Sequence, residues 1–301
     1  MPAVVSPVRA WWLAARPATL PAAAVPVCVG VAAAVHEGAA LRPPVFAATL
    51  LAALLIQVGT NFANDYSDFR RGADHDGRLG PTRVTQGGLL SMGAVRAGVL
   101  TAFAAAAFVG GWLAWIGGWP IVAIGVASII CGLGYTGGPW PFGYHGLGDV
   151  FVFVFFGLVA VTGASYLQGG AWSALVITVS VPVGLLVTNI LVVNNLRDRP
   201  TDQAAGKRTL AVRIGDRATR LQYAAFTGIA YVVVADLAFT SAERRWLLLP
   251  WLTLPLAAWL VREVLRGVEG RALNAILERT GQLLLAFGVL LAAGLAMKVA
   301  R

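Results

Sequence analysis

Two short clusters of acidic and amide residues are the parts of this chain best suited to chemistry. In the first, Asn64, Asp65 and Asp68 follow a long apolar segment at spacings that place them on one face of a helix. In the second, Asp198 and Asp202 follow another apolar segment and lie four residues apart. Carboxylates that face one cavity repel one another, and a divalent cation removes that repulsion. Oxygen ligands of this kind select Mg²⁺, with Mn²⁺ as a substitute, and two facing clusters predict two ions that bridge a diphosphate.

Basic residues flank both clusters and suit an anionic leaving group. Arg71 and Arg78 follow the first cluster, while Arg197, Lys207 and Arg208 surround the second. Such side chains bind diphosphate and favour its departure. Lys207 and Arg208 are the strongest candidates, because they follow the second cluster closely.

A proline stands between the two acids of the second cluster. Pro200 disfavours helical geometry at Arg199, the residue before it. We therefore expect the helix to kink or end there, and Asp202 to lie on the following turn.

The composition indicates where these clusters must be placed. Of the 301 residues, 58% are hydrophobic and 12% are charged, whereas a soluble domain carries about 25% charged residues. Long unbroken apolar runs exclude the alternating pattern of a membrane β-barrel, and a hydrocarbon core of about 30 Å needs helices of about 20 apolar residues. We predict an all-α membrane protein, a single polytopic domain over residues 1–301, with about nine transmembrane helices around a central cavity and polar cytoplasmic loops that cap the active site. The predicted spans are about 16–36, 45–64, 95–116, 119–136, 148–168, 172–193, 220–240, 246–262 and 280–299.

The distribution of basic residues orients these spans. If the N-terminus is cytoplasmic, 18 of the 23 Lys and Arg residues fall in cytoplasmic segments. The positive-inside rule therefore predicts a cytoplasmic N-terminus and places both acidic clusters on the cytoplasmic side. The same rule accounts for much of the net charge of +9, so we expect no nucleic-acid partner.

The two acidic clusters also suggest an internal repeat. Asp68 and Asp198 are 130 residues apart, with four predicted helices in the interval. An even number of helices gives both halves the same orientation, which favours a parallel pseudo-repeat. The halves would cover residues 16–136 and 148–262, followed by the last helix, 280–299, and the site would lie between them.

A secondary transporter with paired acidic sites is an alternative to an enzyme. Transporter acids usually lie near the middle of the membrane. The two clusters here lie at one face, which favours the enzyme.

At these residues the chain resembles the UbiA superfamily of intramembrane prenyltransferases. The resemblance rests on Asn64-Asp65-Tyr-Ser-Asp68 and Asp198-Arg-Pro-Thr-Asp202, which occur in order and on the expected helices. It implies metal binding by Asn64, Asp68, Asp198 and Asp202, with Asp65 nearby. Many members carry a further acid four residues after the first motif, where this chain has Gly72, and the resemblance implies that Asp74 takes that place. It also implies that Tyr135 lines the central cavity.

Within the superfamily, the chain is most similar to the branch that prenylates 1,4-dihydroxy-2-naphthoate in menaquinone synthesis. The resemblance implies transfer of a polyprenyl group from polyprenyl diphosphate to that acceptor with loss of carbon dioxide, in the plasma membrane of a bacterium. Other superfamily acceptors, such as 4-hydroxybenzoate, a chlorin, haem or a phosphoribose, are the alternatives. The stretches that carry this resemblance are Arg16-Pro-Ala-Thr-Leu, Gly59-Thr-Asn-Phe-Ala-Asn-Asp-Tyr-Ser-Asp68, Arg78-Leu-Gly-Pro81, Tyr135-Thr-Gly-Gly-Pro, Gly143-Tyr-His-Gly-Leu-Gly-Asp149, Val193-Asn-Asn-Leu-Arg-Asp198 and Gly206-Lys-Arg-Thr-Leu-Ala-Val-Arg-Ile-Gly215.

Overall fold

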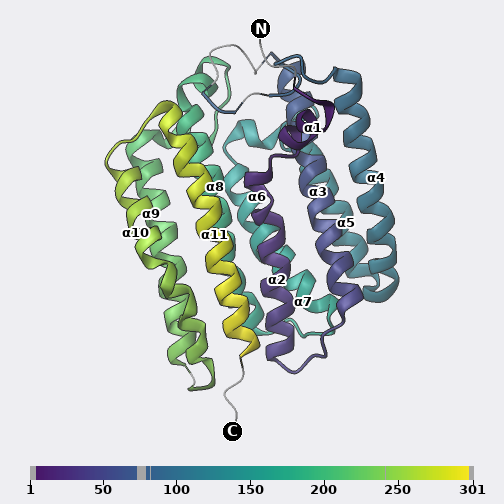
Figure 1. Ribbon diagram of the computed structural model, residues 1–301, viewed down its shortest axis with the longest axis vertical. Coiled ribbons are helices and arrows are strands. Elements are labelled where there is room, and N and C mark those ends of the chain that lie inside the picture. Colours follow the sequence, from purple (N-terminus) through teal and green to yellow (C-terminus); the bar gives the residue numbers. More distant parts are fainter. Residues whose placement is uncertain (1–4, 73–78, 82, 241, 298–301) are drawn as a thin grey trace.

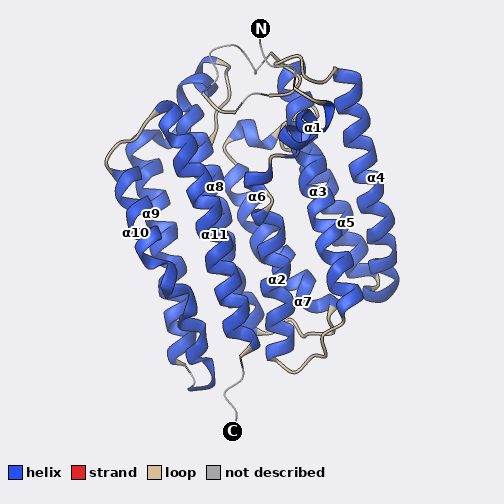
Figure 2. Ribbon diagram, viewed as in Figure 1, coloured by secondary structure: helices blue, strands red, loops and turns tan. Residues whose placement is uncertain are grey.

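The computed structural model describes residues 5–72, 79–81, 83–240 and 242–297, and every regular element among them is a helix (Figures 1 and 2). The elements in chain order are α1 (Pro7–Ala15), η1 (Pro17–Thr19), α2 (Pro21–His36), α3 (Pro43–Arg70), α4 (Met92–Gly117), α5 (Trp119–Gly134), η2 (Phe142–His145), α6 (Gly148–Val152), η3 (Phe153–Val159), α7 (Ala160–Leu167), α8 (Ala174–Ala204), α9 (Leu210–Phe239), η4 (Ala242–Thr253), α10 (Leu254–Leu265), η5 (Gly270–Ala272) and α11 (Leu273–Ala296).

Local sequence signals set several of these boundaries. The hydroxyl of Ser91 accepts a hydrogen bond from the backbone N–H of Ala94 and caps α4, and Ser173 caps α8 through the N–H of Val176. Gly118 separates α4 from α5 with a positive φ of 69°, a conformation that favours glycine. Helices that follow one another in the chain therefore turn back sharply and pack side by side.

Seven helices in the described part of the chain are long and apolar enough to cross a membrane, and an eighth span is formed if the bent pair Pro7–Thr19 and Pro21–His36 counts as one. Each of the nine predicted segments falls on helical structure, but the number of nine spans is not confirmed, because α5 has only 16 residues. On α4, the side chains of Phe108 and Trp115 are 85% and 89% exposed, as expected for a surface that faces lipid. The protein is a multi-pass membrane protein.

We predicted that the helix would kink or end at Pro200, and the prediction of an end there was wrong. The helix α8 continues through Pro200 to Ala204, so Asp202 lies on the helix and not on a following turn. A proline deprives a helix of one hydrogen bond, and this loss falls in the last two turns, where the chain is close to solvent.

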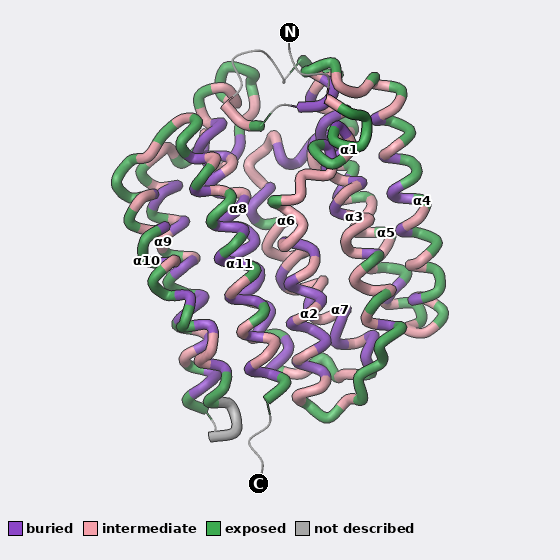
Figure 3. Tube along the Cα trace, viewed as in Figure 1, coloured by how far each residue is buried: buried purple, intermediate pink, exposed green. Residues whose placement is uncertain are grey.

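The most buried helix is α8, which packs against α9, α11 and the π-helical segment η3 (Figure 3). It comes close to η3 at two glycines, where a Cβ atom on Gly157 would lie 2.6 Å from the Cα of Gly184. The outer faces of α4 and α10 are exposed (Figure 3). The long helices α3 and α8 both end at the end of the molecule where the N-terminus lies (Figure 1), so the two acidic clusters that they carry lie at the same end.

Candidate active site

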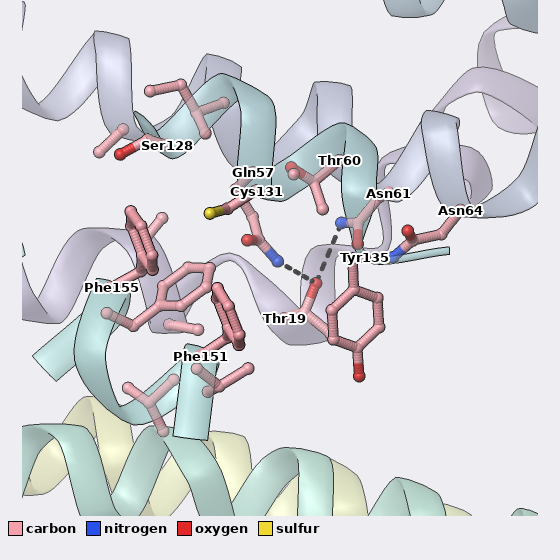
Figure 4. A pocket seen from close by; sticks show the side chains of 18 of the residues that line it. Thr19, Gln57, Thr60, Asn61, Asn64, Ser128, Cys131, Tyr135, Phe151 and Phe155 are labelled. Atoms are coloured by element: carbon pink, nitrogen blue, oxygen red, sulfur yellow. Dashed lines mark hydrogen bonds between the residues drawn. The ribbon is translucent and has the colours of Figure 1, made fainter. Parts of the chain in front are cut away.

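A cavity of about 830 Å³ lies among the helices, and the last turns of α3 and α8 line one end of it. Asn64, Asp68, Asp198 and Asp202 all contribute to this polar end. Mostly aliphatic and aromatic side chains line the remainder, including Phe151 from α6 and Phe155 from η3, together with a few polar ones such as Gln57 and Asn61 (Figure 4). The structure therefore brings the two acidic clusters to one cavity that joins a charged end to an apolar chamber.

Asp68 is the centre of the polar end. Its side chain is 4% exposed and accepts hydrogen bonds at both carboxylate oxygens. Arg83 donates to Oδ2 at 3.1 Å, while the hydroxyl of Tyr144 and the Nζ of Lys207 donate to Oδ1 at 2.7 Å and 3.3 Å. Two cations and one phenol therefore surround a single buried carboxylate.

Lys207 connects the two clusters. Its Nζ lies 3.3 Å from Asp68 and 3.9 Å from Asp202, so it forms ion pairs with an acid of each cluster. The same ammonium lies 4.6 Å from the centre of the Tyr144 ring, within range of a cation–π interaction. The segment that follows α8 thus folds back over the end of α3.

Asp198 is held by its neighbour in the chain. The guanidinium of Arg197 donates to both carboxylate oxygens of Asp198, at 2.8 Å from Nε and 2.6 Å from Nη2. It also donates to the side-chain oxygens of Asn194 and Asn274, both at 2.8 Å. Arg197 is therefore occupied in fixing Asp198 between α8 and α11, although it was predicted to bind diphosphate.

The other two residues of the first cluster differ in what they contact. The hydroxyl of Thr136 donates to Oδ1 of Asn64 at 2.8 Å. The carboxylate of Asp65 accepts hydrogen bonds from the backbone N–H groups of Val84 and Thr85, at 3.2 Å and 3.3 Å. Asp65 therefore fixes the loop that presents Arg83 to Asp68.

Tyr135, which directly follows α5, lines the cavity as expected (Figure 4). Its ring presents an apolar and polarisable face to the cavity.

Two predicted diphosphate-binding residues do not line the cavity. Arg71 is exposed, donates a hydrogen bond to the carbonyl oxygen of Gly138, and lies 5.7 Å from the centre of the Tyr144 ring. Arg208 is exposed and contributes its backbone N–H to the carbonyl oxygen of Tyr144. Asp74 and Arg78 lie outside the described residues.

Sequence reasoning did not single out three residues that complete the polar end. Tyr144 lies in one of the stretches quoted for the resemblance, but no role was predicted for it. Thr136 adjoins Tyr135 but carried no signal of its own. Asn274 lies at the start of α11, in the part of the chain outside the quoted motifs, and its contact with Arg197 depends on a fold that sequence spacing does not reveal.

The oxygen donors at the polar end suit a magnesium ion that arrives with a diphosphate. Among the residues that the structure describes, no three His, Cys, Asp or Glu side chains lie close enough to hold a metal ion by themselves. Mg²⁺ usually binds one or two carboxylates and takes its other ligands from water and phosphate. The carboxylates of Asp68 and Asp202 near Lys207, with the Asn64 amide on the same helix as Asp68, offer such a partial set. The residues present therefore fit a metal that is completed by substrate.

Comparison with known proteins agrees with this geometry. Residues 23–284 match the UbiA prenyltransferase family. The chain is 38% identical over 286 residues to a 1,4-dihydroxy-2-naphthoate octaprenyltransferase from Mycobacterium tuberculosis, covering 95% of this chain and 96% of that one. It is 36% identical over 284 residues to the Escherichia coli protein of the same name, covering 92% and 91%. A UbiA homolog from Archaeoglobus fulgidus, solved with DMAPP and Mg²⁺, has a TM-score of 0.63 at 13% identity and covers 94% of this chain and 99% of that one. The chain belongs to the UbiA prenyltransferase family.

Proposed function

We propose that this protein transfers a polyprenyl group from polyprenyl diphosphate to 1,4-dihydroxy-2-naphthoate, with loss of carbon dioxide, to give demethylmenaquinol and diphosphate. The observation that carries the proposal is the single cavity in which Asp68, Asp202 and Lys207 stand at one end and an apolar chamber begins beside them. A diphosphate fits the first part and an isoprenoid chain fits the second. The names of the bacterial relatives support the choice of acceptor.

The basic residues at the polar end prepare it for a diphosphate. Lys207 and Arg83 contact Asp68 and line the cavity, so they can turn from the carboxylate to the phosphate oxygens of the substrate. Two magnesium ions, replaceable by Mn²⁺, would be held by the oxygen donors of Asn64, Asp68, Asp198 and Asp202, and would neutralise charge on the departing diphosphate. Arg197 keeps the Asp198 carboxylate in place for this role.

The chamber beside the polar end suits an allylic cation. The bond between the first prenyl carbon and the diphosphate oxygen breaks, and the electron pair leaves with the diphosphate. The rings of Tyr135, Phe151 and Phe155 can stabilise the positive charge, and the surrounding helices exclude water. The electron-rich ring carbon that bears the carboxylate forms the new bond, and the carboxylate then leaves as carbon dioxide, which returns the electron pair of the broken bond to the ring and restores its aromaticity. The protein contributes position and charge and forms no covalent bond with substrate.

The proposed site opens toward the cytoplasm of a bacterial cell, whose plasma membrane supplies the polyprenyl diphosphate. The split of 18 to 5 basic residues supports this orientation.

The test is an acceptor panel. Purified protein receives labelled polyprenyl diphosphate and magnesium with either 1,4-dihydroxy-2-naphthoate or 4-hydroxybenzoate, and prenylated product and released carbon dioxide are measured. We expect product and carbon dioxide with the naphthoate alone. Transfer to 4-hydroxybenzoate without reaction of the naphthoate would refute the acceptor, and a failure to transfer to either would refute the reaction.

A further inference from the structure

Four polar side chains form a stripe along α3, and all of them line the cavity. They are Gln57, Asn61, Asn64 and Asp68, spaced by four, three and four residues, which keeps them on one helix face. Gln57 is the deepest of the four, about 10 Å along the helix axis from Asn64 at a rise of about 1.5 Å per residue. A polar side chain at this depth in a membrane protein indicates a functional role.

A hydrogen-bond network fixes which way the Gln57 amide faces. The hydroxyl of Thr19 donates to the carbonyl oxygen of Arg16 at 2.9 Å, so its oxygen can only accept from other groups. It accepts from Nε2 of Gln57 and from Nδ2 of Asn61, both at 3.2 Å (Figure 4). The amide nitrogen of Gln57 is therefore held by Thr19, and the amide oxygen, Oε1, is the end of this cavity-lining side chain that has no partner among the described residues.

That oxygen has no hydrogen-bond partner among the residues that the structure describes, although Gln57 is only 7% exposed. A buried acceptor without a donor is destabilising. The isoprenoid chain of the first substrate has no donor to offer, whereas a phenolic second substrate has one. The oxygen therefore suits the acceptor molecule and not the prenyl chain.

We propose that Oε1 of Gln57 accepts a hydrogen bond from the 4-hydroxyl of 1,4-dihydroxy-2-naphthoate and positions its ring in the cavity. This inference rests on the proposed function. The 1-hydroxyl stands beside the carboxylate and donates to it within the molecule, so the 4-hydroxyl is the donor that remains for the protein. The hydrogen bond sets the depth and the in-plane rotation of the ring, and with them which ring carbon meets the allylic cation.

The experiment compares two ligands and a matched pair of variants. Binding of 1,4-dihydroxy-2-naphthoate and of 1-hydroxy-2-naphthoate, which lacks the 4-hydroxyl, is measured by calorimetry on purified protein with magnesium and inorganic diphosphate, without oxygen. The variant is Gln57→Met, which keeps the length of the side chain. The control is Gln168→Met, because Gln168 is also buried at 2% exposure, also has an amide atom without a partner among the described residues, and lies outside the cavity.

We expect wild type and Gln168→Met to bind the dihydroxy ligand about two- to twelvefold more tightly than the deoxy ligand, the range for one neutral hydrogen bond. Gln57→Met should bind both ligands about equally, with its affinity for the deoxy ligand unchanged. The inference is overturned if Gln57→Met keeps the preference of wild type, if wild type shows none, or if the variant loses affinity for both ligands by the same factor.

Thr19→Val decides the matter if Gln57→Met does not fold. Without the hydroxyl, the amide can present its nitrogen to the cavity, so the preference for the dihydroxy ligand should fall, and an unchanged preference would overturn the inference.

Because these experiments measure ligand binding, their outcome does not depend on whether the protein transfers a prenyl group. A wild type that shows the preference but transfers no prenyl group would refute the proposed function and leave the assignment of Gln57 standing.

Discussion

Replacing Asp198 by Asn tests the double role of this carboxylate, as an ion-pair partner and as a member of the proposed metal site. Its partner Arg197 has a side chain that is 1% exposed, and Asp198 itself is 10% exposed. Two hydrogen bonds of 2.6 Å and 2.8 Å join them. Removing the negative charge leaves a buried guanidinium without its counter-ion, so we expect Asp198→Asn to lose stability as well as turnover.

The magnitude follows from the burial of the pair. Breaking a buried ion pair by removing one partner costs about 3–5 kcal/mol. Asparagine keeps one oxygen that can still accept from Arg197, which places the cost near the lower end, at about 3 kcal/mol. In a protein of this size such a loss lowers the midpoint of thermal unfolding by about 5–10 °C.

The assay is thermal unfolding of purified protein followed by size-exclusion chromatography, with prenyl transfer measured in parallel. The double variant Arg197→Met/Asp198→Asn removes the stranded charge as well, so it should recover most of the lost stability and none of the turnover. Glu263→Gln is the control, because its partner Arg266 is 55% exposed and such a surface pair contributes little. The reasoning is refuted if Asp198→Asn unfolds at the wild-type temperature, or if the double variant regains turnover.

Three further predictions follow from the site, the orientation and the packing. Excess EDTA should abolish turnover and added Mg²⁺ should restore it, while Ca²⁺ supports it poorly because it prefers a larger coordination shell; full activity in EDTA would contradict the metal site. Cysteines placed at Ser91 and Ala204 should resist an impermeant thiol reagent applied to intact cells, whereas one at Ala40 should react, and the reverse labelling would overturn the orientation. Gly157→Ala should destabilise the protein by about 1–3 kcal/mol, because its methyl group would meet the Cα of Gly184, and an unchanged thermal midpoint would contradict that contact.

The sequence was sufficient to predict the class of fold, because apolar segments of membrane length leave few alternatives. It was also sufficient to predict that two acidic clusters share one cavity, since motif spacing and helix orientation placed both at the same face. Helix ends were less predictable. The helices α3 and α8 extend to Arg70 and Ala204, past the predicted ends at 64 and 193, because polar side chains at a helix end are compatible with helix outside the membrane.

The roles of individual basic residues could not be settled from the sequence, because the positive-inside rule accounts for the position of each of them equally well. Only the structure separates Lys207, which reaches both clusters, from Arg208, whose side chain is exposed next to it. It likewise shows Arg197 occupied by Asp198 and Asn274, a residue 77 positions away. Pairing between distant residues depends on packing, and no pattern along a single sequence encodes it.

The contact between Gly157 and Gly184 also bears on how genetic variation in this protein is read. The two backbones touch at glycines, which have no side chain to take part in the chemistry, and a single methyl group on Gly157 would force them apart. Larger side chains at either position would therefore appear among loss-of-function alleles beside substitutions of the active-site acids. Abundance of the mutant protein in the membrane would tell the two groups apart: alleles at the glycine contact lower it, whereas Asp202→Asn, which strands no fully buried cation, leaves it near normal while activity is lost.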